Sequence, residues 1–360
     1  MATTMAVGGR TMKAVFYEEQ GDIGNLRYAD VPVPDCGDDE CLVGVEAVAL
    51  NGFDPMMALG TTALKTPLPM VPCGDASGRV AELGPGANAL RERHGLEPLG
   101  RGDRVSLYPF VAGRGMMGEV VPGTCREYFA VPAANLLPVP AAVSFVDAAA
   151  LPIAYGTAYR LMHTRAEVEP GERVLVLGAA GGVGTCCVQL AKRIGAEVIA
   201  CATGAGKAAS LAAIGADHVV DTSREDFVAA ARRIAGRPRF LGGGGVDVVV
   251  NYVGGETWAP ALRTVRRGGR VVTCGASAGH DPRTDLRYVW SFELEIRGSN
   301  GWLPEDQRRV LALVADGGLK PLIHAVRPMR RAAESIAELA ARRVVGKSVL
   351  LPPRAETPAT

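Results

Sequence analysis

Two polar residues follow directly on an apolar run near the start of the chain. The segment EAVALNGFDPMM (46–57) places Asn51 and Asp54 three positions apart. Its Asn-Gly step is typical of a tight turn with a positive φ. Asp54 is a preferred helix N-cap, and Pro55 suits the first helical position that follows it. The segment is therefore either a turn that opens a short helix, or part of an active site in which Asn51 and Asp54 are the polar groups.

A glycine-rich segment, VLVLGAAGGVGTCCVQLAKRIG (174–195), is the strongest chemical motif. A strand-like run leads into the glycines and a helical pattern follows, which is the context of a dinucleotide-binding turn. The spacing is A-x-G-x-x-G from Ala179 rather than G-x-G-x-x-G. Gly181 would let a pyrophosphate approach the backbone, and Gly184 would let helix and strand pack closely. The residues expected to bind the dinucleotide here are Gly178, Gly181, Gly182, Val183 and Gly184. The alternative is a glycine-rich turn without a ligand.

The end of the next predicted strand bears on which dinucleotide is bound. NAD-binding chains usually carry a carboxylate there, which binds the 2′-hydroxyl of the ribose. This chain has ACATGAGK (200–207), without an acid. Thr203 offers a hydroxyl and Lys207 a positive charge, which suit a 2′-phosphate. We expect NADPH as the cofactor, and the alternative is that Lys207 is only a solvent-exposed lysine in the first turn of a helix.

Composition and charge exclude several classes of partner. The formal net charge of +1 gives no field that would attract nucleic acid or an anionic membrane. Arginines cluster at 263–270 and 327–331, but no aromatic residues are interleaved to stack on bases, so a solvated surface is the expected role. The N-terminus lacks the pattern of a secretory signal, and no apolar run approaches the ~18–20 residues of a membrane span. We expect a cytoplasmic chain.

The pattern of predicted elements changes along the chain. The first third is punctuated by Gly, Pro and Asp and has the pattern of short strands. From about residue 140, short β-branched strands alternate with helices, which is typical of a parallel sheet covered on both faces. Ser144 or Asp147 is expected to cap a helix, Gly195 to close one, and TSRE (222–225) to form a capping box before DFVAAARRIAG. The expected fold is α/β, a Rossmann doubly wound parallel sheet with a β-rich second domain.

Nearly the whole chain, from about Met12 to Pro352, resembles the medium-chain dehydrogenase/reductases. Within that superfamily it is most similar to the zinc-independent quinone oxidoreductase and enoyl reductase branch. The segments that carry the resemblance are MKAVFYEE, NGFD, PMVPCGDASGRV (69–80), GDRV (102–105), CREYFAVPA, AAALPIAYGTAY (148–159), GAAGGVG, GADHVVD, VDVVVNYVGG and GKSVLLP. The resemblance implies a GroES-like catalytic domain beside the Rossmann domain. The expected limits are 1–11 for a flexible extension, 12–138 and 303–352 for the GroES-like domain, 139–302 for the Rossmann domain, and 353–360 for a tail.

The resemblance also bears on metal. The three catalytic zinc ligands of zinc-dependent members fall on Asn51, Gly74 and Ile153, and none of these offers a thiolate or an imidazole. The structural zinc lobe would follow GDRV, but the segment there, SLYPFVAGRGMMGEV (106–120), contains no cysteine. The chain also has no CxxC pair. We expect no metal site. Without a metal to stabilise an alkoxide, alcohol oxidation is difficult. Hydride addition to an activated C=C bond or a quinone requires less of the protein, because the conjugated carbonyl delocalises the charge. The protein then needs only to align the reactants and stabilise an oxyanion.

The resemblance assigns roles to individual residues. It places Asn51 and Asp54 beside the nicotinamide, with Thr157 near the nicotinamide face. Asn251 and Gly275 follow two strands of the sheet and are expected to bind the cofactor, mainly through the backbone. Tyr155 is a candidate proton donor, as is Tyr252, and solvent is the alternative.

The segment DLRYVWSFELEIRGSNGW (285–302) resembles the crotonyl-CoA reductase/carboxylase subgroup, which favours an apolar, carbonyl-conjugated substrate such as an enone or enoyl thioester. Its FELEIRG part has the pattern of an edge strand, and the resemblance implies a homodimer formed by pairing such edges. Two other functions stay open. One is a zinc-type alcohol dehydrogenase, and the other is a non-catalytic NADPH-binding protein.

Overall fold

The computed structural model describes residues 9–353. Most of the predicted extension (1–11) and tail (353–360) therefore lies outside the described residues. The chain divides into two compact units. The first contains the residues up to Pro152, then Ile323–Arg343, then the chain from Lys347 onward, and the second contains Ile153–Leu322 and Val344–Gly346. Both borders fall later in the chain than the expected 138/139 and 302/303.

A six-stranded parallel sheet forms the second unit. Its strands are β10 (Arg173–Leu177), β11 (Glu197–Ala202), β12 (His218–Asp221), β13 (Val246–Val250), β14 (Val265–Thr273) and β15 (Glu295–Gly298). They lie in the order β12-β11-β10-β13-β14-β15, which is the 3-2-1-4-5-6 order of a dinucleotide-binding sheet. The expected doubly wound sheet is confirmed, and β15 lies at its edge as the alternating pattern predicted.

The second unit also contains helices, most of which connect successive strands of the sheet. They are α4 (Pro152–Tyr159) with a π-helical turn (Arg160–Arg165), α5 (Gly182–Ile194), α6 (Ala205–Ala213), α7 (Phe227–Ala235), α8 (Trp258–Leu262) after a 3-10 turn (Gly255–Thr257), α9 (Leu286–Ser291) and α10 (Pro304–Ala315). Gly195 closes α5 at φ 97°, as predicted. The predicted capping box at 222–225 is wrong. Asp226 caps α7 by accepting from the Ala229 N–H at 2.8 Å, whereas Thr222 Oγ1 lies 2.9 Å from Thr203 Oγ1.

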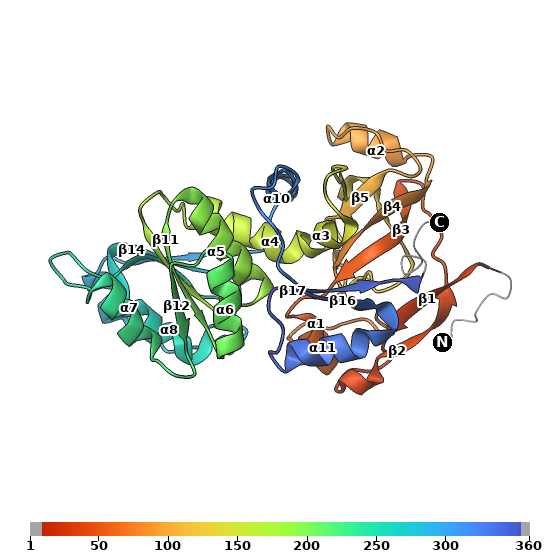
Figure 1. Cartoon of the computed structure of the whole chain (residues 1–360). Helices are drawn as coiled ribbons and strands as arrows, with labels where there is room; N and C mark the ends of the chain where they lie inside the picture. Colours follow the sequence, from red (N-terminus) through yellow and green to blue (C-terminus); the bar gives the residue numbers. More distant parts are fainter. Residues whose placement is uncertain (1–8, 354–360) are drawn as a thin grey trace. The chain divides into compact units, whose positions relative to one another are not determined.

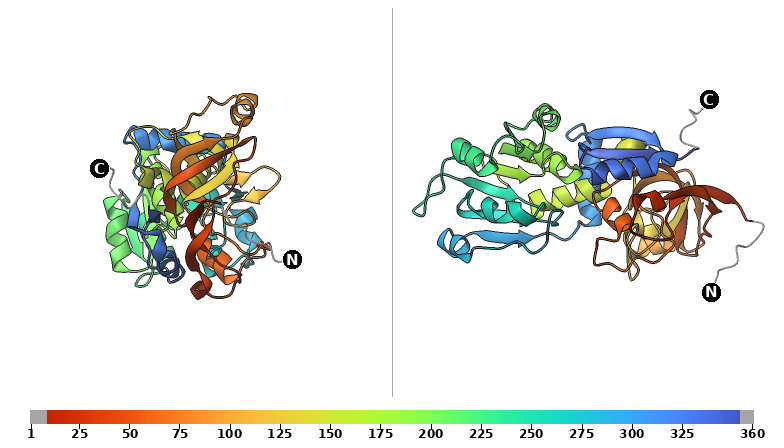
Figure 2. Two further views of the ribbon diagram at one scale, coloured as in Figure 1. Left: turned by 90° about the vertical axis from the view of Figure 1, so that its right-hand side faces the viewer. Right: turned by 90° about the horizontal axis from the view of Figure 1, so that it is seen from below.

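The first unit is built mainly from antiparallel strands. They are β1 (Thr11–Phe16), β2 (Arg27–Pro32), β3 (Glu40–Ala49), β4 (Asp75–Leu83), β5 (Arg104–Leu107), β6 (Phe110–Val111), β7 (Gly115–Met116), β8 (Tyr128–Pro132), β9 (Leu136–Pro138), β16 (Ile323–Pro328) and β17 (Lys347–Leu351). The main sheet has the order β16-β17-β3-β4-β5-β9, and β8 also pairs with β3. The C-terminal strands, blue in Figures 1 and 2, thus join a sheet begun by residues near the N-terminus.

Short helices complete the first unit. They are α1 (Asp54–Leu59), α2 (Ala87–Arg93), α3 (Phe145–Ala150), α11 (Ala332–Ala340), and 3-10 turns at Ile23–Asn25, Ala133–Asn135 and Met329–Arg331. Ser144 caps α3 by accepting from the Asp147 N–H at 3.0 Å, as predicted. Within residues 9–353, no helix has the length and apolar character needed to cross a membrane.

Gly184 is the position where α5 comes closest to the turn that follows β10. A Cβ on this glycine would lie 2.6 Å from Ala179 Cα and 2.6 Å from the Gly178 carbonyl oxygen. These neighbours are backbone atoms and cannot rotate away, so we expect Gly184→Ala to destabilise the protein by about 1–3 kcal/mol in thermal unfolding.

Gly206→Ala is the matched control. Gly206 also lies in a helix, but a Cβ there would meet no atom within 4 Å. Removal of a helical glycine should then stabilise the protein by about 0.5–1 kcal/mol. Equal effects of the two substitutions would contradict the close packing assigned to Gly184.

Candidate active site

The turn after β3 has a different geometry from the predicted one. The Asp54 N–H donates to the Asn51 carbonyl at 3.0 Å and closes the turn. Neither Asn51 nor Gly52 has a positive φ, so that prediction is wrong. Asp54 is not the N-cap either, because Phe53 takes that position and Asp54 is the first residue of α1. Pro55 lies in the first helical turn, as predicted.

Asp54 uses its carboxylate to tie two loops together. One oxygen accepts from the Asn51 N–H at 2.6 Å and the other from the Cys73 N–H at 3.2 Å. Cys73 has a φ of 73°, which is strained for a residue with a side chain, and its carbonyl accepts from the Thr124 N–H and hydroxyl. Complete burial raises the pKa of Asp54 to about 7, despite these two hydrogen bonds. Asp54 therefore fixes the backbone on either side of the site.

A buried lysine joins Asn51 to the first residue of β4. Lys347, at the start of β17, places Nζ 2.6 Å from Asn51 Oδ1 and 3.0 Å from Asp75 Oδ2. Asn51 Nδ2 donates to the same Asp75 oxygen at 2.9 Å. The side chains of Lys347 and Asp75 are only 2% and 0% exposed. Because an ammonium only donates and a carboxylate only accepts, these partners allow one orientation of the Asn51 amide.

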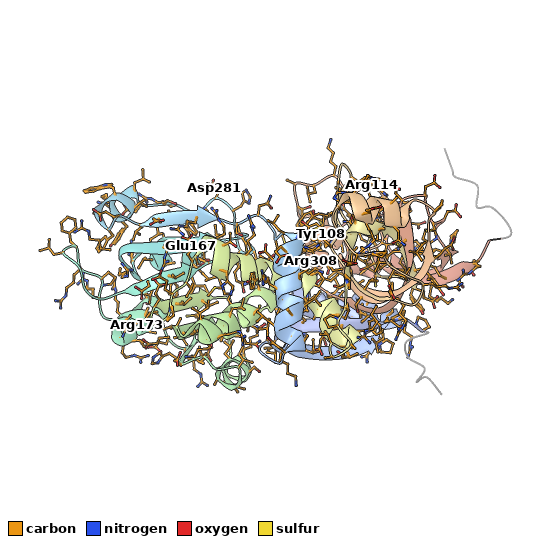
Figure 3. All side chains as sticks on the ribbon, turned by 90° about the horizontal axis from the view of Figure 1, so that it is seen from above. Tyr108, Arg114, Glu167, Arg173, Asp281 and Arg308 are labelled. Carbon is orange, nitrogen blue, oxygen red and sulfur yellow. The ribbon has the colours of Figure 1, made fainter. Side chains whose placement is uncertain are left out.

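The buried pair differs from the ion pairs at the surface. Arg173, Glu167 and Arg114, labelled in Figure 3, belong to ion pairs in which both side chains are partly exposed. Exposed pairs of this kind contribute about 0–1 kcal/mol. Lys347 and Asp75 have lost their hydration, so each depends on the other for a counter-charge.

Asn51 keeps hydrogen-bonding capacity after these contacts. Its amide has two N–H groups and two lone pairs, and the cluster uses one of each. Asn51 as a whole residue is 6% exposed. The cluster therefore leaves one N–H of the Asn51 amide unused and fixes its direction.

Sequence reasoning missed two members of this site. Lys347 is a single lysine in the apolar strand KSVLL, and a charge at such a position is a signal for a buried partner. Tyr17 is 1% exposed, and its hydroxyl has no hydrogen-bond partner among the described residues. Burial, with the Asp54 charge nearby, raises the pKa of Tyr17 to about 12. Nothing in the local pattern MKAVFYEE distinguishes Tyr17 from an ordinary core residue.

The glycine-rich turn has the geometry that a pyrophosphate needs. Gly181 is the N-cap of α5, no side chain caps this end, and no acid lies in its first turn. A Cβ on Gly181 would meet only the Tyr252 hydroxyl at 3.5 Å and the Gly178 carbonyl at 3.6 Å, so packing within the protein does not require glycine there. No capping side chain therefore covers the amides and the positive dipole end of this 13-residue helix, which are the groups that bind a phosphate. The dinucleotide fits this site.

The segment after β13 supports the same turn. The Tyr252 hydroxyl donates to the Gly178 carbonyl at 2.7 Å, and burial raises the pKa of Tyr252 well above its ordinary value. Asn251 Oδ1 accepts from the N–H groups of Val253 and Gly254. Asn251 Nδ2 is buried without a partner among the described residues, which leaves a donor at the carboxyl edge of the sheet. Gly275, after β14, is exposed at the same edge.

The segment after β11 lies beside the end of β12. Asp221 accepts from the Gly204 N–H at 2.8 Å and from the Ser223 N–H and hydroxyl, which hold the pKa of this carboxyl below its usual range. Asp221 belongs to the third strand of the sheet along the chain rather than the second. Thr203 lies at this edge too, and Lys207 lies in the first turn of α6.

The two remaining predicted residues lie in α4. Tyr155 is fully buried, its hydroxyl accepts from the Leu322 N–H at 2.9 Å, and burial raises its pKa further above the ordinary value than that of Tyr17. These properties give Tyr155 a structural role and oppose proton donation. Thr157 is 7% exposed, and its place near the nicotinamide stays a prediction.

Sheet order, glycine turn and cap geometry together define a dinucleotide-binding oxidoreductase fold beside a β-rich unit. Residues 182–316 match the family model described as "Zinc-binding dehydrogenase", and residues 37–141 match "Alcohol dehydrogenase GroES-like domain". The 2-methylene-furan-3-one reductase of Solanum lycopersicum is 32% identical over 347 residues, which cover 95% of this chain and 79% of that protein. The chain belongs to the medium-chain dehydrogenase/reductase superfamily, with a GroES-like first unit and a Rossmann-type second unit.

Longer proteins and solved structures also match. The spectinabilin polyketide synthase system protein NorB of Streptomyces orinoci is 36% identical over 322 residues, 88% of this chain, but the chain spans only 13% of NorB. A solved structure described as an NAD-dependent alcohol dehydrogenase is 34% identical with a TM-score of 0.85, covering 94% of this chain and 99% of that one. The 2-octenoyl-CoA carboxylase reductase CinF, solved with NADP and 2-octenoyl-CoA, is 27% identical with a TM-score of 0.83, covering 98% and 90%.

The buried pair predicts a large effect of removing one partner. Lys347→Met leaves the Asp75 charge uncompensated in the core, so we expect a loss of about 3–5 kcal/mol in urea denaturation. Asp75→Asn together with Lys347→Met removes both charges, and the double variant should lose less than the sum of the single variants.

Lys13→Met is the control for this prediction. Lys13 pairs with Asp30 at 2.7 Å in the same unit, but both side chains are well exposed. Its removal should change stability by no more than about 1 kcal/mol. Additive losses in the Asp75/Lys347 cycle would show that the two charges do not depend on each other.

Proposed function

We propose that the protein is an NADPH-dependent, zinc-independent reductase of activated C=C bonds or quinones. The observation that carries this proposal is the Lys347–Asp75–Asn51 cluster, which presents one oriented amide donor where zinc-dependent relatives would hold a metal. A homologue named as a 2-methylene-furan-3-one reductase and the structural similarity to CinF support the substrate class. Because the chain spans only part of NorB, the activity of that longer protein is not transferred.

The chemistry of the available ligands supports zinc independence. Asn51 Oδ1 and Asp75 Oδ2 are the nearest oxygen donors, and both already bind the Lys347 ammonium. A divalent cation would have to displace a buried positive charge from this position. In residues 9–353, no group of three or more His, Cys, Asp and Glu side chains is placed to hold a metal. The family model with zinc in its description matches residues 182–316, outside this cluster.

The chain's own residues bind and orient both reactants. NADPH, when bound, supplies the hydride for the β-carbon of the conjugated substrate. The first-turn amides of α5 hold the pyrophosphate, and Asn251 Nδ2 and the backbone at Gly275 offer donors for the nicotinamide half. The remaining Asn51 N–H donates to the substrate carbonyl oxygen, where negative charge develops as the β-carbon is reduced. Lys347 and Asp75 keep this amide from rotating.

A proton must reach the substrate α-carbon to complete the reduction. Tyr155 and Tyr252 both have buried hydroxyls engaged with the backbone and raised pKa values. Tyr17 is also buried, and its raised pKa makes it a weak acid. We therefore assign the proton to solvent.

We also propose a cytoplasmic homodimer formed through the edge of the parallel sheet. The outer side of β15 pairs with no other strand among the described residues. Ile296 on this strand and Leu286 and Trp290 on α9 are exposed apolar side chains, which pairing with a second copy would cover.

The acceptor specificity tests the proposed function. We expect NADPH oxidation with enones, quinones or enoyl-CoA esters, and none with simple aldehydes. Asn51→Ala should lower kcat roughly 100-fold, as loss of one oxyanion donor does, while NADPH binding changes little. Stopped-flow or steady-state absorbance at the NADPH band measures both.

Asn88→Ala is the control, because the Asn88 amide bonds only the Leu99 backbone in the same unit. A folded Asn51→Ala variant with full turnover would show that Asn51 only forms the turn and takes no part in catalysis. NADPH binding without turnover on any acceptor would favour the non-catalytic alternative, and activity on alcohols would favour the alcohol dehydrogenase.

Cofactor preference has its own test. Lys207→Glu replaces the cation expected at the 2′-phosphate by an anion, so kcat/KM for NADPH should fall at least about 10-fold relative to NADH. Lys320→Glu reverses an exposed charge elsewhere in the second unit and should leave the ratio unchanged. An unchanged ratio in Lys207→Glu would contradict the assignment of Lys207 to the 2′-phosphate. NAD is the alternative cofactor, because a structurally similar protein is described as an NAD-dependent alcohol dehydrogenase.

A further inference from the structure

Four arginines line a cavity in the second unit that the proposed reaction does not use. The cavity measures about 200 Å³ and is lined by Arg232, Arg237, Pro238, Leu262, Arg263, Val265, Arg287, Tyr288, Ser291 and Phe292. These residues come from α7 and the loop after it, from the junction of α8 and β14, and from α9. No acidic residue is among them. The lining therefore carries four positive charges and no negative charge.

The cavity lies at the opposite edge of the sheet from the glycine-rich turn. The loops after α7 and α8 lead into β13 and β14, so they lie at the amino ends of these strands. Gly178 follows β10 and lies at the carboxyl end. Because all the strands are parallel, the two places are separated by the length of the sheet. A ligand in the cavity would be distinct from the dinucleotide.

Three of the arginines are without a counter-charge. Within residues 9–353, no carboxylate pairs with Arg232, Arg237 or Arg263. Arg232 Nε is buried and has no hydrogen-bond partner in that part of the chain. Arg287 differs, because it pairs with Asp285 at 2.8 Å. The neighbouring cluster in the sequence is also different, since Arg266, Arg267 and Arg270 all have carboxylate partners.

Aromatic rings make one wall of the cavity and hold one arginine in place. Tyr288 and Phe292 are stacked with ring centroids 5.9 Å apart and planes 14° apart. The Arg263 guanidinium lies 5.6 Å from the centre of the Tyr288 ring. A cation over an aromatic face is held in place while its N–H groups stay free to bind an anion. The aromatic wall therefore positions the Arg263 guanidinium without using its N–H groups.

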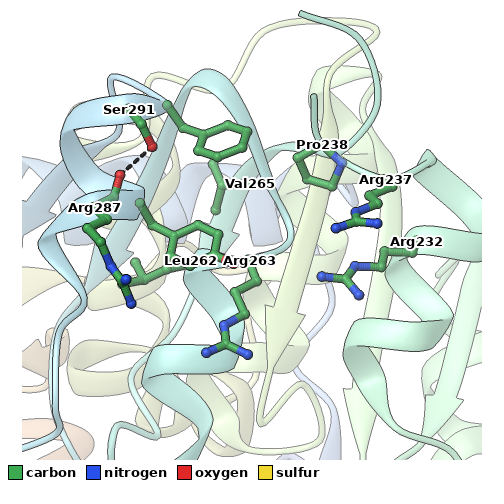
Figure 4. A pocket seen from close by; sticks show the side chains of 10 residues that line it. Arg232, Arg237, Pro238, Leu262, Arg263, Val265, Arg287 and Ser291 are labelled. Atoms are coloured by element: carbon green, nitrogen blue, oxygen red, sulfur yellow. Dashed lines mark hydrogen bonds between the residues drawn. The ribbon is translucent and has the colours of Figure 1, made fainter. Parts of the chain in front are cut away.

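The arrangement of the arginines indicates what they bind. Figure 4 shows Arg232 and Arg237 together on one side of the cavity, with Arg263 and Arg287 toward the other. Guanidinium groups bind phosphoryl oxygens in pairs of parallel hydrogen bonds. The volume is several times the ~30 Å³ of one water molecule and below the range of drug-sized ligands. We propose that this cavity binds a diphosphate group, with Arg232 and Arg237 on one phosphoryl and Arg263 on the other.

Calorimetric titration of the NADPH-saturated protein with inorganic pyrophosphate at low salt tests the proposal. Saturating NADPH keeps the glycine-rich turn occupied. We expect one pyrophosphate per chain, binding that weakens as salt is added, and at least 10-fold weaker binding of inorganic phosphate. Arg232→Gln combined with Arg263→Gln should raise the Kd for pyrophosphate at least 10-fold and leave turnover unchanged.

Arg233→Gln is the matched control, because Arg233 neighbours Arg232 on α7 but pairs with Glu225 at 2.8 Å. It should change the Kd less than twofold, and circular dichroism confirms that all variants are folded. A titration with ADP distinguishes the source of the group. Tighter binding of ADP than of pyrophosphate indicates a nucleoside diphosphate, and equal binding indicates a free diphosphate. Absence of saturable binding, equal binding of phosphate, or an equal loss in Arg233→Gln overturns the proposal.

Discussion

The buried ion pair between Lys347 and Asp75 is the interaction on which the first unit's site depends. It joins the start of β17, near the end of the chain, to the start of β4 and to the turn after β3. Neither charge is tolerable in the core alone, so the C-terminal segment must return before this site exists. The orientation of the Asn51 amide is thus set by a residue almost three hundred positions away. The Asn51 amide can therefore take this orientation only after the C-terminal segment has folded back onto the first unit.

The second unit brings residues that are distant in the sequence together through its parallel sheet. Parallel strands bring Gly178, Thr203, Asn251 and Gly275 to one edge, although long stretches of sequence separate them. The backbone there is shaped by close approach at Gly184 and by the Tyr252 hydroxyl on the Gly178 carbonyl. Side chains contribute mainly by organising main-chain amides. The glycine pattern therefore shapes the backbone at this edge of the sheet.

The local sequence pattern predicted the order of strands and helices, but it did not predict all the residues of the candidate site. The alternation of strands and helices, the Ser144 cap and the Gly195 terminus depend on neighbours in sequence, and each was predicted. Asp54 was misassigned because a cap residue and a first-turn residue differ by one position, and only the fold shows that Cys73 is its second partner. Lys347 and the arginine cavity were missed since their partners lie on distant segments. Thr222 failed as a cap because Asp226 offered a competing acceptor nearer the helix.

The Lys347–Asp75 pair also restricts how this protein can change over generations. Replacement of either residue by an uncharged one leaves a lone charge inside the first unit, and selection removes variants that fall below the stability needed for function. A descendant with a metal ligand at position 51 would therefore need to lose the lysine and rearrange Asp75 almost together. The two residues are therefore expected to change together during evolution. As long as the Lys347 ammonium is present, it limits which side chains position 51 can carry.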